Sequence, residues 1–452
     1  MNTPRSMLFV IIELAAMLAI VGCSTPQQET AAASTGSREQ TGRADEPLMP
    51  SPNPDNPSDQ GYTGPYEVVP DWPKPVSTWP GGEGWTWGAT QAIFVESPNR
   101  IFLGMRGLLP ELRAREGFGE ASEVITADLG TQGPVRLLLP VTGAPVRNAS
   151  VMSPGEVTDL SWSVEGKDYK WEHIITVLDA DGNLLEDWSQ WDALFKPRNM
   201  KRAQGRVHKI RISPYDPEKR VWAIDDGNHV IRIFSNDGKR LLQTIGTFGE
   251  QADDDTHFEG RQNDIAWLPD GTFFVADGYE GARVVKFDKD GNFLMRWGQR
   301  GVEGGNEKRP GYFNTVHGIA VDNQRRVYVV DRSNRRIQIF DENGNFLHQW
   351  YLGDLSATYN IEITENQVMW ISDGHGNFKM YKYDLNGRML YQWGTKGSQI
   401  PGELWGVHQF SVDSDGNLYT AEVWGGRPQK FRPRPGVDPR MLVGQPVRVA
   451  WK

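Results

Sequence analysis

The chain has 452 residues, enough for a large folded core, and its 49 glycines and 17 tryptophans suit many tight turns and aromatic packing between strands. Lysine and arginine number 48 against 58 aspartates and glutamates, so the formal net charge is −10, and no block of basic residues forms a stripe. This balance argues against nucleic acid as a ligand. The single cysteine, Cys23, excludes an internal disulfide.

The amino terminus has the layout of an export signal. Arg5 precedes an apolar run from Met7 to Val21, and Cys23 follows shortly after it. The stretch Leu18-Ala-Ile-Val-Gly22 before this cysteine resembles the lipobox of bacterial lipoproteins, in which the cysteine is lipidated and becomes the first mature residue. We therefore predict a signal peptide over residues 1–22 and a lipid anchor at Cys23. The alternative is an uncleaved membrane anchor, for which the run is short.

Residues 23–62 are rich in Pro, Ser, Thr, Gln and Gly and have almost no large apolar side chains. Such a composition cannot form a core, so we predict a disordered tether. The folded domain, residues 63–452, is then held by lipid at the bacterial cell envelope, on the periplasmic or the outer face.

A repeating unit of four short strands follows the tether. Its clearest copy runs from His317 to Trp350, with alternating apolar residues that give the strand period and a turn at Asp341-Glu-Asn-Gly344. A second copy runs from Asn263 to Trp297 and aligns with the first, with Asn263 where His317 stands.

Further copies start near His208, Tyr359 and His408, and a divergent first copy starts at Gln91. The first copy is interrupted by an insertion at about 113–170, a candidate lid, before residues 173–177 and the turn at Asp181 complete it. Repeats of roughly 40 to 50 residues with four strands are typical of propellers. We predict an all-β, six-bladed β-propeller, closed by pairing of Tyr66–Val69 with the last blade, since an open edge invites aggregation.

Three histidines, His208, His317 and His408, occupy the same position in alternate repeats. In a ring of six blades, this spacing directs three imidazoles toward the axis. Imidazole suits Zn²⁺, and three protein ligands leave one coordination position open for a substrate oxygen or a water. The alternative is three buried histidines that are hydrogen-bonded and structural. His375 lies in a loop expected near the axis and is a second-rank candidate.

Four aspartates also recur at one position of the repeat, Asp225, Asp277, Asp331 and Asp373. We interpret them as acceptors for backbone N–H groups in repeated turns rather than as catalysts.

Several of these segments together resemble a known family. The motif Val275-Ala-Asp-Gly-Tyr279, the motif Val316-His317-Gly-Ile319 and the turn Val330-Asp-Arg332 are similar to those of the peptidyl-α-hydroxyglycine α-amidating lyases and their bacterial NHL-repeat relatives. The similarity covers about Tyr66 to Phe431. It implies a six-bladed propeller with a zinc ion on three histidines, which fall on His208, His317 and His408.

The resemblance also assigns roles to other residues. Tyr279 becomes the catalytic base, Arg106 the first-blade arginine that assists it, and Arg332 a further arginine of the site. Glu280 stands where the family has a disulfide cysteine. Gln409 stands where an aspartate usually helps to hold a structural calcium, so calcium is doubtful here and zinc is the expected cofactor.

The implied reaction cleaves a carbinolamide C–N bond after the hydroxyl proton is removed. A phenol is a poor base at its usual pKa near 10, but a nearby cation stabilises the phenolate. Arg106 and Arg332 could clamp a substrate carboxylate with paired hydrogen bonds, or form salt bridges at blade edges.

Three hypotheses for function remain. The first is a zinc-dependent carbon–nitrogen lyase that acts on a small or peptide-derived α-hydroxy amide. The second is a metal-dependent hydrolase, in which a zinc-activated water attacks an ester, lactone or amide. The third is a non-catalytic propeller that binds another envelope protein or a glycan. In each case we expect a monomer whose other partner is the lipid bilayer, reached through Cys23.

Overall fold

The computed structural model describes residues 63–110, 125–128, 134–137, 165–167, 169–196, 207–302, 304–305, 307–353, 357–397 and 401–451. The chain divides into two compact units, Met1–Asp45 and Glu46–Lys452, and the first lies wholly outside the described residues. The predicted signal peptide, Cys23, the tether over 23–62 and most of the insertion at 113–170 lie outside them as well. No helix within the described ranges is long and apolar enough to cross a bilayer.

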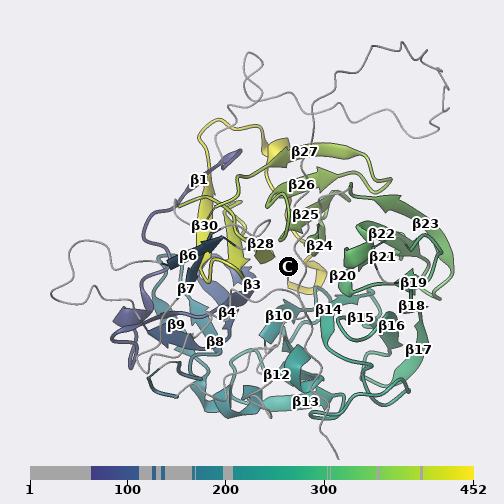
Figure 1. Ribbon diagram of the computed structural model, residues 1–452, viewed down its shortest axis with the longest axis horizontal. Coiled ribbons are helices and arrows are strands. Elements are labelled where there is room, and N and C mark those ends of the chain that lie inside the picture. Colours follow the sequence, from purple (N-terminus) through teal and green to yellow (C-terminus); the bar gives the residue numbers. More distant parts are fainter. Residues whose placement is uncertain are drawn as a thin grey trace, which may run out of the picture. The chain divides into compact units, whose positions relative to one another are not determined.

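Six four-stranded antiparallel sheets lie around a common axis in the second unit, which confirms the predicted six-bladed propeller (Figure 1). Blade one consists of β3 (Thr90–Ser97), β4 (Arg100–Met105), β8 (Ile175–Leu178) and β9 (Leu184–Asp187). Blade two consists of β10 (Val207–Ile212), β11 (Val221–Asp225), β12 (Val230–Phe234) and β13 (Leu241–Ile245). Blade three consists of β14 (Gln262–Trp267), β15 (Phe273–Asp277), β16 (Arg283–Phe287) and β17 (Phe293–Trp297).

The other three blades repeat this order. Blade four consists of β20 (Val316–Val321), β21 (Val327–Asp331), β22 (Arg336–Phe340) and β23 (Phe346–Tyr351). Blade five consists of β24 (Thr358–Ile363), β25 (Met369–Asp373), β26 (Met380–Tyr383) and β27 (Met389–Trp393). Blade six consists of β28 (Val407–Val412), β29 (Leu418–Glu422), β30 (Pro428–Pro433) and β1 (Tyr66–Val68). Three two-stranded sheets join β2 (Trp85–Trp87) to β5 (Leu108–Pro110), β6 (Ile125–Asp128) to β7 (Pro134–Leu137), and β18 (Gln299–Arg300) to β19 (Tyr312–Phe313).

The ring is closed by the amino-terminal strand, as predicted. Strand β1 pairs antiparallel with β30, with Tyr66 opposite Pro433 and Val68 opposite Phe431. Strand β1 thus covers the edge of β30 and becomes the fourth, outermost strand of the last blade, which closes the ring.

Apolar side chains between neighbouring blades form the core. One buried cluster holds Phe102 of blade one against Phe234 of blade two, and another holds Tyr419 of blade six against Leu103 of blade one. Equivalent clusters join the remaining neighbours. Each fully buried large apolar side chain contributes roughly 1.5–3 kcal/mol, so packing between blades fixes the ring without a disulfide.

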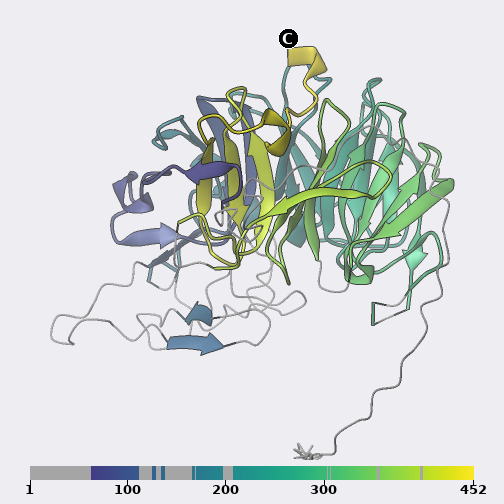
Figure 2. The ribbon, with the colours of Figure 1, turned by 90° about the horizontal axis from the view of Figure 1, so that it is seen from above.

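The carboxyl-terminal segment, with η7 (Pro439–Met441) and η8 (Val449–Trp451), crosses one face of the ring (Figure 2). There the guanidinium of Arg448 donates to the carbonyl oxygens of Val95 and Val412, which lie near the ends of the inner strands of blades one and six. The amide of Ala450 donates to Pro214 of blade two. This face lies at the end of the inner strands.

Every inner strand carries a β-bulge near its start, and this feature positions the site. The bulged residues are Gln91, His208, Asn263, His317, Tyr359 and His408. A bulge bends a strand and redirects one side chain. The three histidines, which share one repeat position in the sequence, therefore all lie at the bulge of an inner strand.

Candidate metal centre

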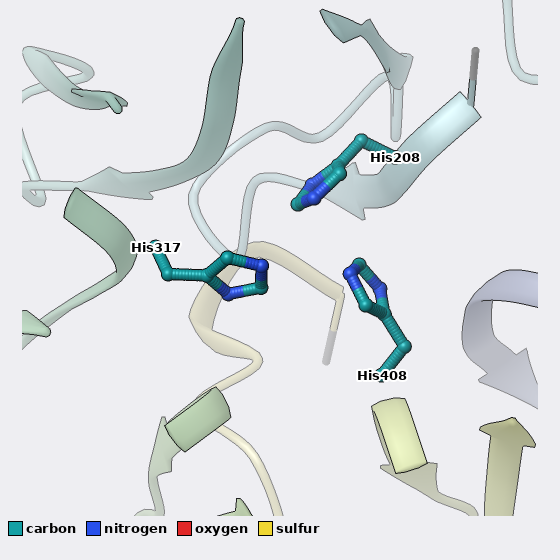
Figure 3. A group of neighbouring side chains, drawn as sticks. All are labelled: His208, His317 and His408. Carbon is teal, nitrogen blue, oxygen red and sulfur yellow. The ribbon is translucent and has the colours of Figure 1, made fainter. Parts of the chain in front are cut away.

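The structure brings the three predicted histidines together on the axis (Figure 3). One ring nitrogen from each of His208, His317 and His408 lies within 4.8 Å of the others. The three side chains come from β10, β20 and β28 and converge from three sides, and all three residues are at most 1% exposed. The bulges on alternate blades thus produce the threefold arrangement that the sequence predicted.

The intervening blades orient the imidazoles. Nδ1 of His208 lies 2.8 Å from the carbonyl oxygen of Asn263, and Nδ1 of His317 lies 2.9 Å from that of Tyr359. Nδ1 of His408 lies 2.9 Å from the carbonyl oxygen of Gln91. Because a carbonyl oxygen only accepts, each Nδ1 carries the proton and each Nε2 is unprotonated. Such outer hydrogen bonds are typical of histidines that bind metal.

Burial keeps these imidazoles neutral. It lowers the pKa of His208 to about 3. Burial, reinforced by the charge of Arg332, also holds the pKa of His317 well below its usual value, and burial does the same for the pKa of His408. Neutral imidazole is the form that binds metal, so no proton has to be displaced near pH 7.

The surroundings of the Nε2 atoms fit a cation. Nε2 of His408 is buried and has no hydrogen-bond partner among the described residues. The hydroxyl of Tyr279 lies 2.8 Å from Nε2 of His317 and 3.3 Å from Nε2 of His208. Since a buried polar atom without a partner is rare, the donor set of three neutral nitrogens fits a zinc ion better than it fits a purely structural network.

Six residues occupy the same repeat position in their blades, and we call this set the rim. It is formed by one residue of each blade, located one or two positions after the second strand: Arg106, Asp226, Tyr279, Arg332, His375 and Trp424. The three residues predicted to be catalytic, Arg106, Tyr279 and Arg332, all belong to it.

Both predicted arginines lie close to the centre. Nη1 of Arg332 donates to the hydroxyl of Tyr279 at 3.3 Å, and its guanidinium carbon is 4.9 Å from the centre of that ring. Nε of Arg106 donates to the side chain of Gln91 at 2.7 Å, and the carbonyl of Gln91 orients His408. Burial lowers the pKa of Arg106.

Sequence reasoning missed Arg261 and Asp226. The guanidinium carbon of Arg261 lies 4.3 Å from the centre of the Tyr279 ring, and the carbonyl of Arg261 accepts the backbone N–H of Tyr279. Its Nε and Nη2 donate to Asp226 at 3.1 and 2.6 Å. Burial alone would raise the pKa of Asp226, but Arg261, His208 and Arg106 together outweigh it, and the pKa falls to about 2. This ionised pair supports the tyrosine, and no local motif marks it.

Tyr359 was also missed, although its repeat position is that of the histidines. Its ring stacks on His317 at 5.2 Å between ring centres, and it lies 5.4 Å from His408. The guanidinium carbon of Arg332 lies 5.3 Å from its ring centre. Arg332 is therefore placed between two tyrosines, Tyr279 and Tyr359.

A buried ionic cluster occupies the next layer along the axis. Nζ of Lys209 donates to Asp264 at 2.9 Å and to the side chain of Asn360, and all three residues are 0% exposed. Arg211 donates to both carboxylate oxygens of Asp264 at 2.9 Å. The side-chain nitrogen of Gln409 donates to the carbonyl of Ile210 at 2.8 Å.

The remaining predictions concern His375 and the repeated aspartates. His375 lies on the rim, 6.0 Å between ring centres from Trp424, and does not belong to the group of convergent ligands. The aspartates accept backbone N–H groups, as predicted: Asp277 from Glu259 at 2.7 Å, Asp331 from Asn314 at 2.8 Å, Asp373 from Ala357 at 2.8 Å and Asp225 from Asn228 at 3.2 Å.

Comparison with known proteins supports the resemblance. The NHL repeat family matches residues 313–340. Peptidyl-glycine alpha-amidating monooxygenase A of Xenopus laevis is 35% identical over 232 residues, which are 48% of this chain and 24% of that protein. Peptidyl-alpha-hydroxyglycine alpha-amidating lyase 1 of Drosophila melanogaster is 28% identical over 292 residues, 60% of this chain and 50% of the lyase. The matched region thus spans between a quarter and a half of these relatives.

Solved structures resemble the chain only in fold. A streptogramin B lyase structure has a TM-score of 0.42 at 9% sequence identity, and the alignment covers 77% of this chain and 94% of the lyase chain. A protein of unknown function from Bacteroides thetaiotaomicron has a TM-score of 0.46 at 14% sequence identity, and the alignment covers 76% of this chain and 70% of that protein's chain. From its six sheets, its NHL repeat and its sequence relatives, the chain is an NHL-repeat propeller related to the peptidyl-α-hydroxyglycine α-amidating lyases.

Proposed function

We propose that this chain is a zinc-dependent lyase that cleaves the C–N bond of an α-hydroxy amide and releases an amide together with glyoxylate or a related aldehyde. The observation that carries the proposal is the position of the Tyr279 hydroxyl, within hydrogen-bond distance of two of three convergent, neutral imidazoles. A proton acceptor and a candidate metal site are thereby placed at one point, as removal of a hydroxyl proton requires.

The histidines His208, His317 and His408 would hold the metal through Nε2, oriented by the three carbonyl groups behind them. Bound there, a zinc ion would polarise the substrate's hydroxyl oxygen. The proposal includes no calcium, because the residue at the relevant position, Gln409, is uncharged and its side chain already bonds the backbone of Ile210.

The proton transfer falls to Tyr279. Its deprotonated oxygen takes the proton of the substrate hydroxyl, the C–N bond breaks as the carbonyl of the aldehyde forms, and the same proton then passes to the leaving amide nitrogen. Atoms and charge balance without a further reactant. Arg332, 3.3 Å from the phenol oxygen, stabilises the negative charge on that oxygen.

The arginines also give the site its preference for an anion. Arg106 and Arg332 lie on the rim on opposite sides of Tyr279 in blade order, and both are guanidinium groups that bind carboxylates in a planar, paired geometry. We assign them the carboxylate of the α-hydroxyglycine group, which becomes the carboxylate of glyoxylate.

The experiment is incubation of the zinc-loaded protein with α-hydroxyhippurate. We expect benzamide and glyoxylate in equal amounts, measured by chromatography and a glyoxylate assay. Zinc bound at one ion per chain without release of glyoxylate would contradict the lyase assignment for this substrate class.

We further propose that the protein works at the bacterial cell envelope as a monomer, exported and held to the bilayer by lipid on Cys23. The support is the lipobox-like stretch before this cysteine and the polar composition of residues 23–62. Replacement Cys23→Ser should move the protein from the membrane fraction to the soluble fraction, and unchanged membrane association would contradict the anchor.

A further inference from the structure

The side chain of Arg332 is buried without a carboxylate beside it. The residue is 7% exposed, and its guanidinium forms no ion pair with an aspartate or glutamate in the part of the chain that the structure describes. Within that part, the guanidinium donates to the hydroxyl of Tyr279 at 3.3 Å. Because arginine is almost never buried unless it is paired, other groups must stabilise this charge.

Other arginines of the same face are neutralised. Nε and Nη2 of Arg261 donate to Asp226 at 3.1 and 2.6 Å. In the segment between β18 and β19, Nη2 of Arg309 lies 2.7 Å from a carboxylate oxygen of Glu307. Arg332 differs from both, so its positive charge remains available to a negatively charged ligand.

Two phenol rings occupy the place of a carboxylate beside Arg332. The guanidinium carbon lies 4.9 Å from the ring centre of Tyr279 and 5.3 Å from that of Tyr359. Both distances are within the range of about 6 Å over which the negative face of an aromatic ring attracts a cation. Such a contact stabilises the charge without cancelling it. We call the two rings, Tyr279 and Tyr359, the aromatic clamp.

The ring of Tyr359 is itself held in place. Tyr359 is the bulged residue of β24, at the repeat position of the three histidines. Its ring stacks on His317 with 27° between the ring planes, and its carbonyl oxygen accepts a hydrogen bond from Nδ1 of the same histidine. On another side, a β-carbon at Gly374 would come within 1.8 Å of the ring, so only glycine fits there. The ring therefore connects a candidate metal ligand to Arg332.

We propose that Tyr359 is a positioning residue for Arg332: its ring fixes the guanidinium beside Tyr279 and leaves the charge open to the carboxylate of the substrate. The inference rests on the proposed function, which assigns this carboxylate to the arginines, and adds the residue that holds one of them. A carboxylate at position 359 would compete with that of the substrate. An aliphatic side chain there would leave a buried charge with less stabilisation.

The test is calorimetric binding of two unreactive ligands, hippurate and hippuramide, to the full zinc-loaded chain. Both carry the benzoyl amide, and hippuramide has a carboxamide in place of the carboxylate. We expect the unmodified protein to bind hippurate more tightly than hippuramide. Tyr359→Leu should weaken hippurate by about 2- to 30-fold, the range for loss of one cation–π contact, and leave hippuramide unchanged. Tyr359→Phe keeps the ring and should bind hippurate as the unmodified protein does.

Two comparisons separate positioning from a general structural effect. In the Arg332→Gln background, Tyr359→Leu should cause no further loss of hippurate affinity, since the ring acts through the guanidinium. The control Tyr312→Leu removes a ring that lies 3.6 Å from the guanidinium carbon of Arg309, an arginine that already has a carboxylate partner, and should change neither affinity.

Three results would overturn the proposal. The first is equal binding of hippurate and hippuramide to the unmodified protein, a comparison that needs no variant. The second is a loss of hippurate affinity in Tyr359→Phe as large as that in Tyr359→Leu. The third is a Tyr359→Leu variant that binds hippurate normally, that weakens both ligands equally, or whose effect persists without Arg332.

These outcomes are distinct from failure of the lyase assignment. Hippurate binding that depends on the Tyr359 ring, without turnover of α-hydroxyhippurate, would contradict the lyase and leave the aromatic clamp. Turnover of α-hydroxyhippurate with hippurate binding that is independent of Tyr359 would contradict the clamp and leave the lyase.

Discussion

The hydroxyl oxygen of Tyr279 lies 2.8 Å from Nε2 of His317, the nitrogen that is free to bind a metal because Nδ1 of the same ring donates to the carbonyl of Tyr359. The phenol therefore donates to the lone pair of Nε2 in this structure. When a cation takes that lone pair, the hydroxyl retains Arg332 as a partner at 3.3 Å and faces the reacting atoms. This arrangement makes the role of Tyr279 testable apart from metal binding.

The variant Tyr279→Phe removes the proton acceptor and keeps the ring between the arginines. We expect kcat/KM for α-hydroxyhippurate to fall at least about 100-fold, a usual contribution of a general base, with zinc content unchanged. Steady-state kinetics and metal analysis on the same preparation check this. Turnover within a few-fold of the unmodified protein would favour a hydrolase that activates water without a tyrosine.

The pair of Arg261 and Asp226 should position Tyr279 without touching the substrate. Loss of a cation over an aromatic ring costs about 0.5–2 kcal/mol, so Arg261→Gln should lower kcat by about 2- to 30-fold with little change in KM. Arg261→Lys should recover part of kcat, since it keeps the charge. By contrast, Arg332→Gln should raise KM as well, and an Arg261→Gln variant with unchanged kcat would rule out the positioning role.

The sequence predicted those features that recur with the repeat. Alternating apolar residues and turn glycines were enough for six blades, and the phase of His208, His317 and His408 was enough for their convergence, because every inner strand has the same bulge. Tyr279 and Arg332 could be assigned because they occur in motifs that resemble a family.

Other parts of the site depend on contacts between blades that are not apparent from local sequence. Arg261 reaches Asp226 of the preceding blade, 35 positions earlier, and Lys209 reaches Asn360 across the axis, 151 positions later. In a propeller, such pairings depend on the final ring geometry. Tyr359 is different: its repeat position could have indicated it, but an aromatic residue there has no metal-binding chemistry to draw attention.

The buried cation Lys209 should matter for stability. Replacement Lys209→Met removes one of two cations that neutralise Asp264, whose side chain is 0% exposed. Breaking a buried ion pair costs about 3–5 kcal/mol, so we expect a loss of that order in the free energy of unfolding, measured by denaturant titration. The surface variant Lys289→Met should change it by less than about 1 kcal/mol, since the side chain of Lys289 is 66% exposed. Equal effects of the two variants would contradict the importance of the axial cluster.

Stability should also depend on pH through Glu422. Burial raises the pKa of Glu422 to about 7, despite the partly compensating charge of Arg427, from a usual value of 4.5. The folded state thus binds this proton more tightly than the unfolded chain, and the resulting stability is fully present below pH 4.5 and lost as the pH rises through about 7.

The variant Glu422→Gln has no such proton. The free energy of unfolding of the unmodified protein, relative to this variant, should fall by about 2–3 kcal/mol between pH 5 and pH 8. Denaturant titrations of both proteins across this range measure it. Parallel pH profiles would show that Glu422 does not titrate as its burial implies.

The most direct test of the account is the metal content of the purified protein. With His208, His317 and His408 intact, we expect about one zinc ion per chain, because three neutral imidazoles converge on one point. Elemental mass spectrometry of the dialysed protein measures this zinc content. A variant with all three histidines changed to alanine should retain almost none. Zinc well below one ion per chain, or zinc that is unaffected by the triple replacement, would contradict the proposed metal centre.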